Sequence, residues 1–239
     1  RISLSNNDSG TSNTIFGKLA GDDIASGGNY NVLIGEDAGH TNKLGDNNIA
    51  IGYDAFDLSY IDDTQDALTV DNIFIGYSAG GGDWATAASH SNVGIGSYAM
   101  DAILNGALNN TAVGHAALSE LTEGDHNVAI GYLVANNVTT GGTNTAIGAR
   151  ALTAITTGSE NISIGFQSAQ ALGAAETGNI SIGNNSMNSM DEGTNGNVNY
   201  NVAIGLESFL GGNMNTSSTD VIGNIAIGAY ALDATSTNA

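Results

Sequence analysis

The chain has 239 residues, with 24 Asp and Glu against 4 Lys and Arg, a net charge of −20, and neither cysteine nor proline. Without cysteine there is no disulfide framework and no thiolate metal site. Nucleic acids and anionic membranes are bound by clustered basic residues, so nucleic acid is excluded as a partner. No stretch approaches the roughly 18 apolar residues that span a bilayer, so no membrane insertion is expected.

One short pattern recurs twelve times along the chain. Each copy begins with an asparagine, continues with three mostly apolar residues and ends with a glycine, which lies four positions after the asparagine. In chain order the asparagines are Asn13, Asn31, Asn48, Asn72, Asn92, Asn110, Asn127, Asn144, Asn161, Asn179, Asn201 and Asn224, and the glycines are Gly17, Gly35, Gly52, Gly76, Gly96, Gly114, Gly131, Gly148, Gly165, Gly183, Gly205 and Gly228.

The spacing of these asparagines, 17 to 24 residues, indicates a unit of 17 residues with insertions in some copies. Such a unit is too short for a helical hairpin or a propeller blade, but it suffices for one coil of a β-solenoid. We therefore predict an all-β fold, a parallel β-roll or β-solenoid of twelve coils. Residues 1–12 are a lead-in and residues 13–239 a single repeat domain. Because the first residue is arginine, we expect a segment of a longer or processed protein.

The residues one and three places after each asparagine are mostly aliphatic, as in Ile49 and Ile51. Residues two apart on a strand share a side, so these pairs are predicted to fill the coil interior. The residue between them is small in most copies, with the exceptions Ile15, Leu33 and Phe74. A row of small residues from Ala112 to Ala226 is then expected to face partner chains, and Ala146→Arg to disrupt association.

The repeated asparagines and glycines are predicted to have architectural roles. Glycine ends each strand where the chain turns sharply or needs φ > 0. Asparagine tolerates the left-handed region, and its amide can bond to the backbone and stack as a ladder from coil to coil. The residues assigned to this role include Asn48, Gly52, Asn127, Gly131, Asn144, Gly148, Asn161, Gly165, Asn201, Gly205, Asn224 and Gly228.

The motif Asn-Val-Ala-Ile-Gly at 127–131 and 201–205, and Asn-Thr-Ala-Ile-Gly at 144–148, resembles the head repeats of trimeric autotransporter adhesins. That resemblance covers residues 13 to about 234 and implies a left-handed parallel β-roll in a homotrimer that binds a host or neighbouring-cell surface, through a glycan or a protein. The unit here is longer than the usual adhesin head repeat. In that respect it is similar to repeats of viral tail fibres and of large surface proteins of marine bacteria, which implies an extracellular location on a virion tail fibre or a cell surface.

The sequence offers little for catalysis. His40, His90, His115 and His126 fall at unrelated positions of the repeat, which disfavours a shared metal site. We expect a structural and adhesive fibre segment that is not an enzyme. The alternative is a glycan-depolymerising tailspike-type hydrolase, which needs two carboxylates facing each other across a groove. Ice binding would need regular threonine rows, which the mixed Thr, Val and Ile positions do not provide.

Insertions interrupt the repeat at residues 57–70, 81–90, 188–199 and 211–222, and unique loops are where binding residues concentrate. The first two insertions are richest in side chains that could contact a partner. Trp84 is expected either to project from the coil and contact a sugar or a protein partner, or to pack beneath its own loop. The predicted binding residues are Tyr60, Asp62, Asp63, Asp66, Asp83, Trp84 and His90.

An acidic cluster surrounds the longest insertion. Hard oxygen ligands at this density could hold Ca²⁺, but no calcium-loop motif is present. We favour a solvated acidic surface and no cofactor, with Ca²⁺ as the alternative. The cluster consists of Asp54, Asp57, Asp62, Asp63, Asp66 and Asp71.

Overall fold

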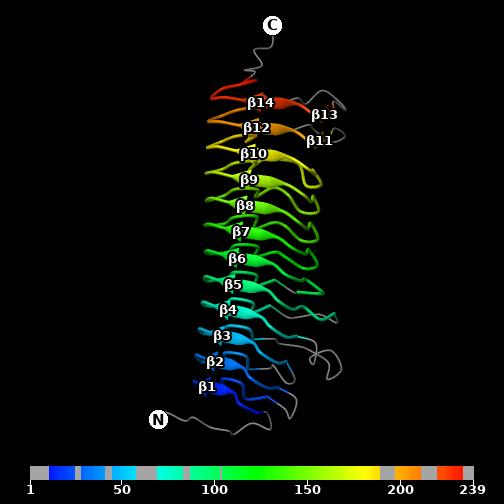
Figure 1. The fold of residues 1–239 in the computed structure, drawn as a ribbon. Helices are drawn as coiled ribbons and strands as arrows, with labels where there is room; N and C mark the ends of the chain where they lie inside the picture. Colours follow the sequence, from blue (N-terminus) through cyan, green and yellow to red (C-terminus); the bar gives the residue numbers. More distant parts are fainter. Residues whose placement is uncertain are drawn as a thin grey trace. The chain divides into compact units, whose positions relative to one another are not determined.

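The structure, a computed structural model, describes residues 11–24, 28–40, 45–57, 69–82, 87–102, 104–188, 197–210 and 220–233. The chain divides into two compact units, residues 1–125 and 126–239. In the first unit, six strands stack one on the next in chain order (Figure 1). They are β1 (Thr14–Phe16), β2 (Val32–Ile34), β3 (Ile49–Ile51), β4 (Ile73–Ile75), β5 (Val93–Ile95) and β6 (Thr111–Val113).

The second unit repeats this arrangement and adds a small second sheet. Its main strands are β7 (Val128–Ile130), β8 (Thr145–Ile147), β9 (Ile162–Ile164), β10 (Ile180–Ile182), β12 (Val202–Ile204) and β14 (Ile225–Ile227). The last residues of the two C-terminal insertions form the second sheet, in which β11 (Val198–Asn199) pairs with β13 (Val221–Ile222) in parallel. These insertions therefore rejoin the stack before the next asparagine.

Both units are parallel β-solenoids, which confirms the predicted fold class, and every predicted triad after an asparagine forms a strand. Neighbouring strands pair in register, as Ile49 with Ile73 and Ile162 with Ile180. The described part of the chain contains strands and turns but no helix. Each strand of the main stacks is only three residues long, so the stability of a coil depends on the coils that it contacts.

Each buried asparagine binds the coil that follows it. The Oδ1 atom of Asn144 accepts a hydrogen bond from the backbone N–H of Asn161 at 3.0 Å, and its Nδ2 atom donates to the carbonyl of Gly158 at 2.9 Å. One amide thus ties both ends of a four-residue turn and satisfies backbone groups that would otherwise be buried unpaired. The same two contacts recur at Asn13, Asn31, Asn48, Asn72, Asn92, Asn161, Asn179 and Asn201.

The glycine after most main strands marks a place where two coils approach too closely for a side chain, and Gly228 in the last coil is an exception. At Gly148 φ is +125°, and a Cβ atom there would lie 2.4 Å from the carbonyl oxygen of Gly165 in the next coil. Three further residues of a typical coil have φ near +60°, in the left-handed region: the residue before asparagine and those two and four places after glycine, as in Thr143, Arg150 and Leu152. The repeat asparagine itself, such as Asn144, is not among these left-handed residues, although the residue directly before it is.

The middle residue of each strand points into the coil, and its two neighbours point outward. Ala129 and Ala146 are completely buried, whereas Ile130 and Ile147 are 39% and 36% exposed. The prediction that the aliphatic pairs fill the interior is wrong, and so is the prediction that the small row from Ala112 to Ala226 faces partner chains. Ala146 cannot contact another chain.

The small residues point inward and the aliphatic residues outward because the coil is thin. The hydroxyl of Ser163, in the middle of β9, donates to the carbonyl of Ser168 across the coil at 2.7 Å. The residue three places after the glycine forms this opposite wall, and in most coils it too is small and buried, as Ala117 and Ala151 show. Between walls so close there is room for Ala, Ser or Gly, so the larger aliphatic side chains point outward.

Large side chains enter the core farther along the coil, at the positions four and seven residues after glycine, as Leu152 and Ile155 show. Where a large residue occupies the middle of a strand instead, the position near it is glycine. A Cβ atom on Gly39 would lie 2.6 Å from Leu33, and one on Gly80 would lie 2.6 Å from the ring of Phe74. The filled volume of the core is thus maintained within one coil, because a large residue in the strand is matched by a glycine four places after the strand-ending glycine.

Candidate functional site

Most of the predicted binding residues lie outside the described residues, namely Tyr60, Asp62, Asp63, Asp66, Asp83 and Trp84. The exception is His90, whose backbone forms a parallel bridge with Leu108 and accepts a hydrogen bond from the N–H of Asn109 at 3.2 Å. Its Nδ1 atom lies 3.3 Å from the hydroxyl of Ser91. His90 therefore joins two coils at the end of its insertion.

The described acidic and histidine residues form no metal-binding group. No three His, Asp or Glu side chains in the described ranges come together in an arrangement that could hold a metal ion. In the first unit His40 lies beside one carboxylate, with its Nδ1 atom 3.9 Å from Asp57 Oδ1. The regular surfaces of the coils are therefore the candidate sites.

The first regular surface is the outward side of the strands. Because the strands pair in register, the outward residues stand in two columns, and every column member in β2–β6 and in the main strands of the second unit is Ile, Val or Thr. None is charged. We call this surface the aliphatic face; in the second unit its columns are Val128, Thr145, Ile162, Ile180, Val202 and Ile225, and Ile130, Ile147, Ile164, Ile182, Ile204 and Ile227.

The aliphatic face is accessible in the single chain. Ile95, Ile130, Ile147, Ile162 and Ile204 are each more than one third exposed. Large exposed apolar patches are uncommon on monomeric proteins and mark sites of association. Within each unit this face carries no charged side chain, although the chain as a whole has a net charge of −20.

The second regular surface is a row of aromatic rings in the first unit, placed one or two residues after the strand-ending glycines. Tyr53 stacks on Tyr77 with ring centroids 5.5 Å apart. Tyr77 then meets Tyr98 edge to face at 5.2 Å, and Tyr98 meets His115 edge to face at 5.7 Å. We call these four residues the aromatic row. Its three tyrosines remain 39–46% exposed, so the rings contact one another and solvent together.

Side chains near the start of the aromatic row are charged. Lys18 and Glu36 occupy the same repeat position in the first two coils and form an exposed ion pair of 2.5 Å, and the hydrogen bond that Lys18 Nζ donates to Glu36 raises the pKa of Lys18. Burial, with Asp37 and Glu36, raises the pKa of the Asp54 carboxyl, and the charge of Asp54 in turn raises the pKa of Tyr53. This end of the row therefore carries a net negative charge.

A second carboxylate adjoins the other end of the row. Burial raises the pKa of Asp101 from its ordinary value of 3.8 to about 6, with the charge of Glu120 adding to the rise. A hydrogen bond from the backbone N–H of Asp101 and the nearby imidazole of His115 act in the opposite direction. At neutral pH Asp101 is mainly ionised, at a site where its negative charge is poorly solvated.

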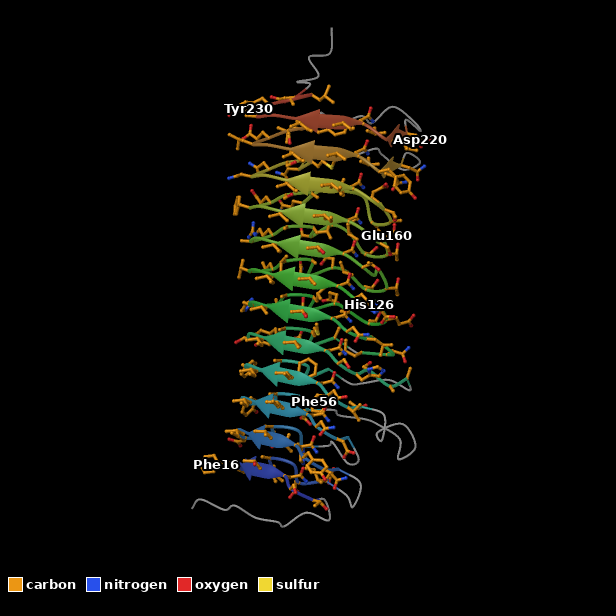
Figure 2. All side chains as sticks on the ribbon, in the orientation of Figure 1. Phe16, Phe56, His126, Glu160, Asp220 and Tyr230 are labelled. Atoms are coloured by element: carbon orange, nitrogen blue, oxygen red, sulfur yellow. The ribbon has the colours of Figure 1, made fainter. Side chains whose placement is uncertain are left out.

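The strands of both units point toward the edge that carries the residues after glycine. Within the second unit, Tyr230 lies at this edge, while Glu160 and Asp220 lie at the opposite edge (Figure 2). Phe16, at the end of β1 in the first unit, likewise lies at the edge toward which its strand points. Within the second unit, Tyr230 is therefore separated by the width of a coil from the edge where Glu160 and Asp220 lie.

Comparison with protein-family models, with curated proteins and with solved structures found no match. The function must therefore be argued from the surfaces themselves. In the ranges that the structure describes, no helix has the length and apolarity to cross a membrane.

Both surfaces have a signal in the sequence. Tyr53, Tyr77 and Tyr132 all directly follow a strand-ending glycine, and Tyr98 comes one residue later in its copy. Such an alignment places rings one above another when coils stack. The two columns of the aliphatic face are also visible in the sequence, but hydrophobicity alone predicts, wrongly, that they point into the coil.

Proposed function

We propose that the chain is a structural and adhesive segment of an extracellular fibre, in a viral tail fibre or a microbial surface adhesin. The aliphatic face is the observation that carries this proposal. Its in-register columns run from coil to coil, so another copy with the same repeat can pack against it along several coils at once. Burial of this surface supplies stability that a coil with a thin interior lacks.

The resemblance to adhesin heads gives the number of copies as three. A closed cyclic arrangement lets every copy bury an identical patch, and no patch remains free to extend the assembly sideways. The proposed trimer therefore places the aliphatic faces toward one another and leaves the insertions accessible to a host or neighbouring cell. The large negative charge fits an extracellular setting, where salt screens repulsion between copies.

The mass of the wild-type chain in solution tests the assembly, measured by light scattering or sedimentation over a range of concentrations. A mass of three chains supports the proposal, and a monomer at micromolar concentration refutes it. Attachment to cells or to isolated surface polysaccharides tests the adhesive role. Release of new reducing ends from those polysaccharides would replace passive adhesion with the hydrolase alternative.

A further inference from the structure

We infer that the aromatic row, Tyr53, Tyr77, Tyr98 and His115, binds a polyhexosamine chain, a glycan of linked hexose rings that carry free amino groups. The inference rests on the proposed adhesive function and gives it a ligand class. It follows from the spacing of the rings, from their exposure and from the charges beside them.

The spacing of the row suits a periodic polymer. Successive ring centroids are 5.5, 5.2 and 5.7 Å apart, because each ring belongs to a successive coil. This interval is similar to the length of one hexose unit, so a glycan that lies along the stack passes a new ring about once per sugar. The row combines two packing geometries, because the ring planes of Tyr53 and Tyr77 differ by 13° whereas the ring of Tyr98 is turned by 68° from that of Tyr77.

The charge beside the row selects among glycans. Asp54 adjoins Tyr53, and Asp101 interacts with both Tyr98 and His115. Among the described residues of the first unit the one lysine or arginine is Lys18, and it is already paired with Glu36. A glycan with carboxylates or sulfates would be repelled, whereas ammonium groups gain from the carboxylates and from the electron-rich faces of the tyrosines.

Sugar chemistry fits this surface better than a basic peptide does. Hexose rings are rigid and have apolar C–H faces that can pack on aromatic rings while the amino groups reach the carboxylates. Lysine side chains bring the same charge, but they lose more conformational entropy when held in one geometry. Pre-organisation therefore favours the glycan.

The inference is tested by calorimetric titration of the wild-type chain with a glucosamine hexamer at low ionic strength. We expect saturable binding that weakens as salt is added. Tyr77→Ala should weaken it about two- to fivefold, the range for an exposed cation–π contact. Asp101→Asn, which removes charge without disturbing a ring, should weaken it to a similar degree.

The matched control is Phe166→Ala in the second unit. Phe166 also follows a strand-ending glycine and is 49% exposed, but its counterparts in the adjoining coils are Ala149 and Asn184, so it belongs to no row. This variant should bind the hexamer as the wild type does. Equal loss in Phe166→Ala and Tyr77→Ala would overturn the inference.

Two comparison ligands decide the ligand class. If the fully N-acetylated hexamer binds as tightly as the glucosamine hexamer, the charge argument is wrong. If oligolysine of equal charge binds as tightly and is weakened equally by Tyr77→Ala, the row is a general cation site and the glycan assignment is wrong. The mass of Tyr77→Ala should equal that of the wild type, since a lower mass would place the row in the contact between copies. Failure of glycan binding with an intact trimer refutes this inference alone, whereas a monomeric wild type refutes the assembly.

Discussion

Two arginine substitutions, one on each side of the same strand, distinguish an effect on assembly from an effect on folding. Ala146 and Ile147 are adjacent in β8, but Ala146 is completely buried inside the coil and Ile147 is 36% exposed on the aliphatic face. We expect Ala146→Arg to prevent correct folding of its coil, because a guanidinium would enter an interior that holds only a methyl group. We expect Ile147→Arg to leave the chain folded and to prevent association.

The magnitude follows from the exposure of Ile147. Complete burial of an isoleucine is worth about 1.5 to 3 kcal/mol, so the third that remains exposed contributes about 0.5 to 1 kcal/mol per chain on association. An unpaired guanidinium adds a desolvation cost of at least about 2 kcal/mol per chain. Three copies together lose about 7.5 to 9 kcal/mol or more, which weakens the assembly by at least about five orders of magnitude.

Sedimentation velocity with circular dichroism of the same samples measures both effects. Ile147→Arg should show wild-type β-structure and the mass of one chain. The matched control is Ile147→Thr, because Thr145 and Thr111 already occupy the aliphatic face. It should keep the assembly with a modest loss. An Ile147→Arg variant that retains the full mass would show that the aliphatic face is not the contact between copies.

Three further predictions concern the stability of the coil. Phe74→Ala should lower the free energy of unfolding by about 3 to 5 kcal/mol in chemical denaturation, and adding Gly80→Met should recover part of it, because the two positions share one volume. Asn144→Ala should cost about 2 to 4 kcal/mol, since it leaves the N–H of Asn161 and a buried carbonyl unpaired, and an unchanged midpoint would contradict the ladder. Asp101→Asn should be more stable than the wild type by about 1 to 2 kcal/mol at pH 8 and not at pH 3: its folded pKa, raised to about 6, lies above the unfolded value, so the wild type loses stability as pH rises through that range.

The repeat predicted the strands to the residue, since one spacing rule places every strand of the main stacks. It did not predict which side of the strand is the interior. Alternation along a strand shows which residues share a side but not which side is buried. Hydrophobicity predicted that the side of Ile49 and Ile51 is the buried one. The interior is too thin for those side chains, so the small residue between them points inward.

The exceptions to the pattern held information about that direction. Leu33 and Phe74 occupy the middle of their strands, and the same coils have glycine at Gly39 and Gly80, where other coils have a large residue such as Leu152. A size exchange within one repeat copy makes sense only if both positions share an enclosed volume. Comparing the copies with each other therefore identifies the core without any structure.

The candidate site was less accessible to sequence reasoning because its residues are unremarkable one at a time. Tyr53 and Tyr77 are separated by 24 residues and an insertion, and only coil stacking brings their rings to 5.5 Å. The pKa of Asp101 is raised by burial that no local pattern indicates. The insertions, in contrast, can be recognised directly in the linear sequence, because they interrupt the repeat.

Regularity is itself a means of recognition in this fold. A repeated surface cannot distinguish one coil from the next, and for that reason it suits partners that are also repeated. Another copy of the chain matches the aliphatic face coil by coil, and a polymer matches the aromatic row ring by ring. Because each added coil contributes a similar increment of contact, affinity for such partners should grow with the number of intact coils, up to the limit set by strain and mismatch. Interrupting the aromatic row in the middle, at Tyr77, should therefore reduce binding to a long glycan more than removing Tyr53 from its end, because only the central change divides the row into two short platforms.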